Sequence, residues 1–319
     1  MLRRIGLPLI CGCVLVLVAG CSKPKPKPRT VSKLVYKLDW KASPSQRSSA
    51  SRADALKTNR EVIMKRLKAF EVQGEVQPRD ESTLEVRVFD TSAKTLEELK
   101  TVLALNGELA LRYVDHESDW LSTQKKAFEK FRETRPKEAA GIVWVDTRQA
   151  ETERVRERTN WFGSYVRSKS KGEIQAFLNT LIVMPYRILG YEKVTNLGGK
   201  EVFWRSVLLE SKVIVTARDI KRASVQYDDN GPYVSLDLKP DAARRFGDET
   251  EANVERFLAV MVDDEVLTAP KIMERIGGGR VRISMGAAAP STRVLESKSL
   301  VIAIASGAYA APMTLVADR

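Results

Sequence analysis

Residues that could do chemistry on their own are scarce in this chain of 319 residues. His116 is the single histidine, and the three cysteines, Cys11, Cys13 and Cys21, all fall within the first 21 residues. A Ser-His or Cys-His catalytic pair would have to be built around His116, which stands between two acids with no nucleophile in sequence reach. Metal sites with several histidines, cysteine-ligated zinc sites and disulfide frameworks are excluded from the body of the protein. We expect His116 to be a surface residue.

Three other patterns could form a site, and each is better explained by a turn or by packing. Asp263 and Asp264 could hold a hard cation or act as acid and base, but they stand at the predicted tip of a hairpin, where Asp commonly forms turns. The triple glycine 277–279 lacks the Lys-Ser/Thr of a phosphate loop. The aromatic stretch 120–131 has the spacing of an internal packing face. The sequence therefore predicts no catalytic residue, no cofactor, no metal and no enzyme; a hydrolase would need a polar cleft containing His116.

The first 21 residues have the layout of a bacterial lipoprotein signal. Two arginines precede an uncharged, mostly aliphatic run over residues 5–20, which ends in Ala-Gly directly before Cys21. This ending resembles the lipobox, at which the cysteine thiol receives diacylglycerol and the signal peptide, residues 1–20, is then removed. An uncleaved membrane anchor is the alternative, but the run has 16 residues and a spanning helix needs about 20. We expect an extracytoplasmic protein lipid-anchored through Cys21, in the outer membrane if the cell has two, because Ser22 and not Asp follows.

The composition describes a basic protein with ordinary cores. Lys and Arg number 53 against 41 Asp and Glu, and removal of Arg3 and Arg4 with the signal peptide leaves 51 against 41. The predicted linker, residues 21–32, alternates cations with proline, which favours an extended spacer whose charges can rest on anionic headgroups. No nucleic-acid motif accompanies the charge, so we expect no nucleic-acid partner. At 43% hydrophobic and 29% charged, the chain suits two domains.

The hydrophobic pattern divides the body into two β/α blocks around a middle stretch. The first block, residues 33–115, alternates strands with helices in the order β-α-β-α-β, over residues 34–38, 56–70, 84–88, 95–103 and 109–113. Residues 116–210 are predicted to be a mixed helical and strand insertion, with an amphipathic helix over 119–134, a strand over 141–146, a charged helix over 151–158, a helix over 173–181 and a strand over 201–209.

The last block, residues 211–319, gives the clearest pattern. Two hairpins are predicted, 223–227 with 233–238 around an Asp-Asp-Asn-Gly turn, and 257–262 with 266–269 around Asp263. A helix over 241–251, a strand over 281–284, a helix from 290 to 307 and a strand over 312–316 complete the block. The late apolar run 299–317 could instead be a terminal membrane helix, but Gly307 and Pro312 interrupt it.

Ordered motifs in this block resemble the SecD family, the accessory subunit of the bacterial Sec protein translocase. Residues 259–272 carry the family's apolar strand, Asp-led turn, second strand and Ala-Pro-x-Ile. Residues 276–280 and 306–313 resemble its glycine loop and its Ser-Gly-Ala-x-x-Ala-Pro ending, and residues 60–70, 84–89 and 96–114 resemble the first half of its large periplasmic domain. The family usually reads Gly-Leu-Asp-Leu followed by paired glycines near its first strand, and residues 37–42 of this chain retain only Leu38 and Asp39 of that pattern. The chain also departs from the family over 115–210.

The resemblance implies an α+β fold with a ferredoxin-like β-α-β base over 33–115, a helical insertion over 116–210 and a β/α head over 211–319. It also implies contact with exported or unfolded polypeptide and with Sec translocase components, and it identifies no polypeptide-binding residue. SecD continues into transmembrane helices where this chain stops at Arg319, so we expect no proton conduction. The leading prediction is a non-enzymatic envelope lipoprotein that assists translocation. The alternative is a structural or adaptor lipoprotein that binds a folded partner.

Overall fold

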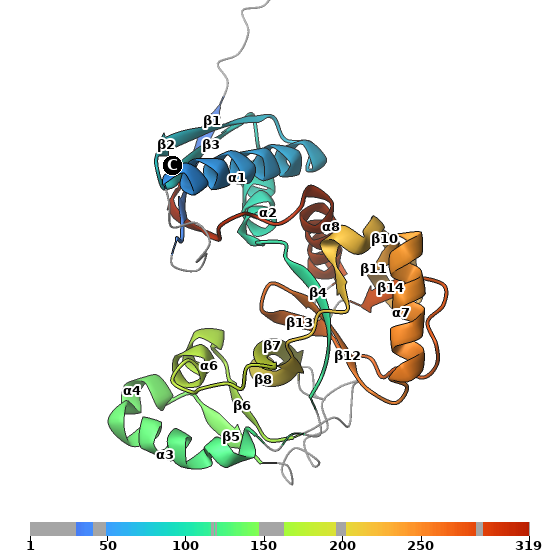
Figure 1. The fold of residues 1–319 in the computed structure, drawn as a ribbon. Coiled ribbons are helices and arrows are strands. Elements are labelled where there is room, and N and C mark those ends of the chain that lie inside the picture. Colours follow the sequence, from blue (N-terminus) through green and yellow to red (C-terminus); the bar gives the residue numbers. More distant parts are fainter. Residues whose placement is uncertain are drawn as a thin grey trace, which may run out of the picture.

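The computed structural model describes residues 30–40, 49–115, 118, 120–146, 163–195, 202–284 and 290–318. Cys21, the signal peptide, most of the linker, His116 and the charged stretch 151–158 lie outside the described residues. Figure 1 shows three regions that follow one another in an arc: the base with β1, α1 and α2 at the top, the head with β10, β11 and α7 at the right, and the insertion with α3 and α6 at the lower left. The fold is α+β, as the sequence predicts.

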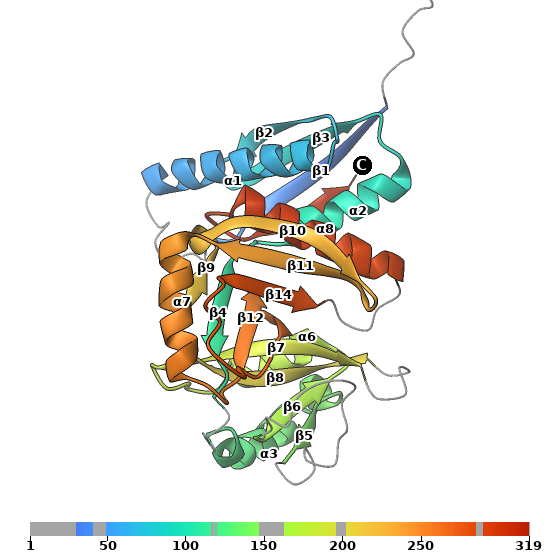
Figure 2. The same cartoon turned by 90° about the vertical axis from the view of Figure 1, so that its right-hand side faces the viewer.

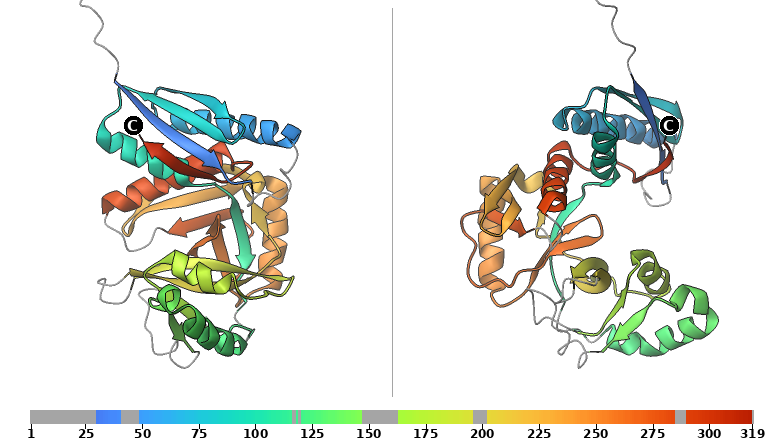
Figure 3. Two further views of the ribbon diagram at one scale, coloured as in Figure 1. Left: turned by 90° about the vertical axis from the view of Figure 1, so that its left-hand side faces the viewer. Right: turned by 180° about the vertical axis from the view of Figure 1, so that it is seen from behind.

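The base is a four-stranded antiparallel sheet with the strand order β15-β1-β3-β2. Its elements are β1 (Val31–Leu38), α1 (Ser49–Ala69), β2 (Gly74–Asp80), β3 (Thr83–Phe89), α2 (Ala93–Ala104) and, from the end of the chain, β15 (Met313–Asp318). This β-α-β-β-α-β order with an antiparallel sheet is the ferredoxin-like arrangement. The whole head and insertion are inserted between its second helix and its last strand. β15 lies beside β1 in Figure 3.

Two strand assignments in the first block differ from the sequence-based expectation. β2 is absent from the predicted order because Val76 is its single buried residue, so it shows no apolar alternation. β4 (Leu109–Tyr113), predicted as the third strand of the base, pairs with β12 in another sheet. Four of its five residues are buried, which is typical of a strand covered on both faces and not of one half-buried in a small sheet.

An eight-stranded sheet joins the insertion to the head, in the order β5-β6-β8-β7-β13-β12-β4-β9. The remaining strands are β5 (Val143–Val145), β6 (Tyr165–Ser168), β7 (Arg187–Thr195), β8 (Val202–Glu210), β9 (Val215–Thr216), β12 (Leu258–Val262) and β13 (Glu265–Thr268). The two regions are joined by the parallel pair β13 and β7 and by an antiparallel bridge between Val114 and Leu209.

The helices of the insertion pack aromatic side chains inward. They are α3 (Lys125–Thr134), α4 (Pro136–Ala139) and α6 (Lys171–Leu178). The ring of Phe177 on α6 lies 5.1 Å from Phe128 and 5.4 Å from Phe131, centroid to centroid, and all three are buried. The interpretation of the aromatic stretch as a packing face is confirmed. The α-helix begins at Lys125, after a short 3₁₀ turn, and not at residue 119.

The head carries a second sheet, β10 (Ile220–Asp228), β11 (Gly231–Leu238) and β14 (Arg280–Ser284), in that order. Both hairpins predicted for this block are present, together with α7 (Pro240–Ala252) and α8 (Pro290–Ser306). Val234 and Leu236 of β11 pack in one core with Leu300 and Ile304 of α8. α8 contacts β10 and β11 on one side and α1 and α2 on the other, so it lies between head and base (Figure 2).

The late apolar run contains no membrane helix in the structure. α8 ends at Ser306, Gly307 has a φ of +89°, and residues 313–318 form β15. Within the described part of the chain, no helix is long and apolar enough to cross a bilayer.

Candidate functional site: a pinned junction and an open strand edge

The chain crosses between base and head twice, and the two crossings lie side by side. The first runs from α2 to β4 through Asn106 and Gly107, and the second runs from α8 to β15 through Gly307 and Tyr309. The Tyr309 N–H donates to the Asn106 carbonyl at 3.1 Å, and the Tyr309 hydroxyl donates to the Leu103 carbonyl at 3.1 Å. Gly107 has a φ of +90°, and a Cβ there would lie 2.8 Å from Arg66 Nη2, so the turn and the close approach both require glycine.

Arg66 of α1 binds both crossings from the base side. Its side chain is fully buried, and it donates from Nε to Ser306 Oγ at 3.1 Å and from Nη1 and Nη2 to the carbonyls of Val102 (3.0 Å), Leu105, Asn106 (3.0 Å) and Gly307 (3.2 Å). These carbonyls stand at the C-terminal ends of α2 and α8, where the helix dipole favours a cation. The guanidinium carbon lies 4.2 Å from the centre of the Tyr309 ring. Burial lowers the pKa of Arg66, but arginine keeps its proton in proteins.

Asp263 holds the first crossing from the head side. It has a φ of +60° in the β12–β13 turn, and its carboxylate accepts from the backbone N–H groups of Asn106 (3.0 Å), Gly107 (2.9 Å) and Glu108 (3.0 Å). Burial raises the pKa of Asp263, and the three amide hydrogen bonds oppose that shift. The crossing is thus bound through its carbonyls by Arg66 and through its amides by Asp263.

Asp264 faces the insertion instead. Its carboxylate pairs with Lys171 and accepts from Gln175 Nε2 at 3.0 Å, both on α6. The interpretation of the Asp pair as turn residues is confirmed, and the structure adds that each of them ties the hairpin tip to a different neighbouring region. Among the described residues, no group of three or more His, Cys, Asp or Glu side chains is arranged to hold a metal ion.

Sequence reasoning missed Arg66, although the sequence holds a signal for it. Leu56, Ile63 and Leu67 give α1 its apolar stripe, and Arg66 falls inside that stripe at helical spacing. A cation at a position that should be buried needs several acceptors. The acceptors come from segments far away in the sequence, so the pattern alone does not show them.

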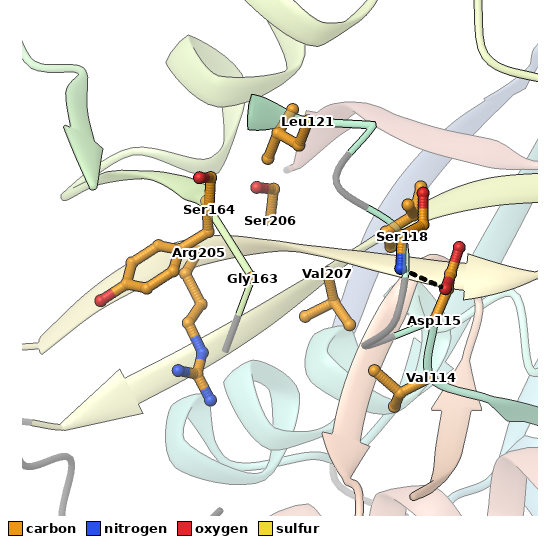
Figure 4. Close-up of a pocket in the computed structure, with 11 residues that line it drawn as sticks. Val114, Asp115, Ser118, Leu121, Gly163, Ser164, Arg205, Ser206 and Val207 are labelled. Atoms are coloured by element: carbon orange, nitrogen blue, oxygen red, sulfur yellow. Dashed lines mark hydrogen bonds between the residues drawn. The ribbon is translucent and has the colours of Figure 1, made fainter. Parts of the chain in front are cut away.

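A small cavity of ≈ 30 Å³ lies between β4, β8 and the start of β6 (Figure 4). Two of its polar side chains already have partners: Asp115 accepts from the Ser118 N–H at 3.0 Å and pairs with Arg187, and Ser206 Oγ accepts from the Val166 N–H at 3.1 Å. That volume holds about one water molecule. The cavity is therefore too small for an organic substrate.

β10 is one of the two end strands of the three-stranded head sheet. Tyr227 pairs with Pro232, which has no N–H, so this pair cannot exchange hydrogen bonds. In an antiparallel ladder, bonded and non-bonded pairs alternate. Gln226, Ser224 and Arg222 therefore bond to β11, and the N–H and C=O groups of Ala223, Val225 and Tyr227 point to the outer edge. No other strand of the described chain pairs with that edge.

The side chains along this edge are partly apolar. Ala223 and Val225 are half-buried on the face that β11 turns towards α8, and Tyr227 on the same face is 62% exposed. The edge thus combines three outward pairs of backbone groups with an apolar row beside a helix. This combination is the one that strand addition uses, in which backbone hydrogen bonds supply affinity and alternate side chains supply selectivity.

Comparison with known proteins finds a match over the head. Residues 193–311 match the model of the SecDF P1 head subdomain. The SecD translocase subunit of Acidaminococcus fermentans is 31% identical over 129 residues, which are 40% of this chain and 30% of that protein. The SecD subunit of Desulfurispirillum indicum is 37% identical over 114 residues, 35% of this chain and 21% of that protein. The aligned part therefore spans less than a third of either relative's length.

Solved structures extend the likeness to most of the body. A SecDF crystal structure in a "super-membrane-facing form" aligns with a TM-score of 0.55 and 17% identity, covering 91% of this chain and 30% of that one. A second SecDF structure, described as a membrane component that enhances protein export, aligns with a TM-score of 0.52 and 18% identity, covering 90% of this chain and 99% of that one. At this identity the alignments show the fold alone. Residues 193–311 are thus similar to the SecDF P1 head subdomain, and the described body shares the fold of the solved SecDF structures.

Proposed function

We propose that this chain is a non-enzymatic, extracytoplasmic lipoprotein, anchored through Cys21, whose head binds exported polypeptide in an extended form and so assists protein translocation. The SecD-type body supports a role beside the Sec translocase. The observation that carries the binding proposal is the open edge of β10, with its outward amides at residues 223, 225 and 227 and the apolar row beside them.

The test compares two substitutions at the middle of that edge. Val225→Pro removes an N–H that points outward and has no bond to β11, and the proline ring blocks strand addition. Val225→Ala keeps the N–H and changes the side chain alone. We expect the full chain to bind a permanently unfolded exported protein saturably at moderate salt, and Val225→Pro to weaken this binding by about tenfold, as expected for one to two lost hydrogen bonds. Fluorescence anisotropy measures both.

Val225→Ala should bind within about threefold of the unchanged chain, because a half-buried methyl pair contributes little. Absence of saturable binding to the unfolded protein would overturn the proposal. The adaptor alternative would be favoured if the protein pulled a discrete folded partner out of native membranes and did not bind unfolded polypeptide.

A further inference from the structure

The outer face of the three-stranded head sheet carries a cross-strand row of alternating charge. Asp237 of β11 lies between Arg222 of β10, at 3.0 Å, and Arg280 of β14, at 3.1 Å, and the register places the three side by side. The side chains of Arg222 and Arg280 are 71% and 73% exposed. Hydrogen bonds from the two guanidinium groups lower the pKa of Asp237, so the carboxylate stays ionised. One carboxylate between two cations leaves a net positive charge in the row.

One of the two cations, Arg222, stands at the open edge of β10, and the other, Arg280, stands on β14 at the opposite edge of the sheet. Arg222 is the last residue of the row on the β10 side, and Lys221 before it is also exposed. The next two rows have no charge on β10, since Ser224 and Gln226 occupy them. At the far end of the strand, Asp228 is neutralised by Arg282 at 2.6 Å. The edge therefore has one cationic end and two polar positions on its outer face.

We infer that the strand added to β10 carries an acidic residue opposite Arg222 and apolar residues opposite Ala223, Val225 and Tyr227. Directly opposite residues in a sheet lie about 4.5–5.5 Å apart at Cβ, and opposite charges there attract. With an acid at this position, negative and positive side chains would alternate across the four strands, in the order acid, Arg222, Asp237 and Arg280. Antiparallel pairing is the more stable kind, and in that direction the occupant reads apolar, polar, apolar, polar, apolar, acidic. The inference rests on the proposed function and specifies which segments of exported chains the head binds.

The test uses two short fluorescent peptides with this alternating pattern, identical except that one ends in Glu and the other in Lys. We expect the full chain to bind the Glu peptide about fivefold more tightly than the Lys peptide, since exposed ion pairs contribute modestly. The preference should shrink as salt is raised. Arg222→Glu should reverse the order of the two peptides. Arg222 is largely exposed, so the variant should keep the fold, which circular dichroism checks.

A matched control separates the row from net charge. Arg244→Glu changes the charge of the protein by the same amount at a side chain that is 77% exposed on α7, outside the row. It should leave the order of the peptides unchanged. Equal binding of both peptides, or a reversal by Arg244→Glu as well, would overturn the inference and leave the proposed function standing. Failure of both peptides and of the unfolded protein to bind would remove the proposed function itself.

Discussion

The base–head junction and the β10 edge differ in how their backbone N–H and C=O groups are hydrogen-bonded. At the junction, five acceptors converge on Arg66 and three amides on Asp263, all in a largely buried site. At the β10 edge, three successive outward positions keep their amides and carbonyls free of any other strand in the described chain. The backbone is therefore hydrogen-bonded internally where the chain crosses between regions, and it is open at the edge where we propose that the head binds polypeptide.

This contrast separates two classes of variant. Changes at the junction leave buried polar groups without partners, which costs stability. Changes at the edge touch groups that water already satisfies, so they should alter binding and leave stability nearly unchanged. A junction variant that keeps full stability would contradict the structural role of the junction. An edge variant that loses stability would contradict the assignment of the edge as a binding surface.

The largest effect should come from Arg66→Met. The substitution keeps the apolar stem but leaves four carbonyls and the Ser306 hydroxyl without their donor, which we expect to cost about 3–5 kcal/mol of unfolding free energy. Urea unfolding followed by circular dichroism measures the loss. Lys65→Met, one residue earlier on the exposed face of α1, is the control and should stay within about 0.5 kcal/mol. A small effect of Arg66→Met would show that the junction is not held by this side chain.

We expect Asp263→Asn to lower the free energy of unfolding by less than Arg66→Met does. Asparagine tolerates the positive φ, so the turn itself should persist. Its amide nitrogen, however, must face one of the three N–H donors of the first crossing, and we expect a loss of about 1–3 kcal/mol in the same urea experiment. Asp264→Asn retains an acceptor for Gln175 and breaks an exposed ion pair with Lys171, so it should cost less than about 1 kcal/mol. Equal losses for the two would contradict the pinning role of Asp263.

The sequence predicted the head better than the base, for a physical reason. The hairpin strands around Asp229 and Asp263 alternate or form short apolar runs, and their partners follow within a few residues, so local patterns suffice. The base sheet closes by pairing β1 with β15, from opposite ends of the body. No local pattern encodes that pairing, and β2, with its single buried residue, gives no apolar signal at all.

The sequence predicted one part of the candidate site and not the other. The turn role of the two aspartates followed from residue type. Arg66 and the free side of β10 did not, because a buried cation is defined by its distant acceptors and an edge is defined by the strand that is absent beside it. In both cases the three-dimensional pairing supplies the information.

Amide hydrogen exchange at β10 tests the central claim most directly. In the free protein, the amides of Ala223, Val225 and Tyr227 should exchange rapidly, while those of Ser224 and Gln226, bonded to β11, should be slow. On addition of an unfolded exported polypeptide, the account predicts that the three outward amides become protected and that the junction amides of Asn106 and Gly107 do not change. Protection elsewhere with unchanged exchange at residues 223, 225 and 227 would contradict it.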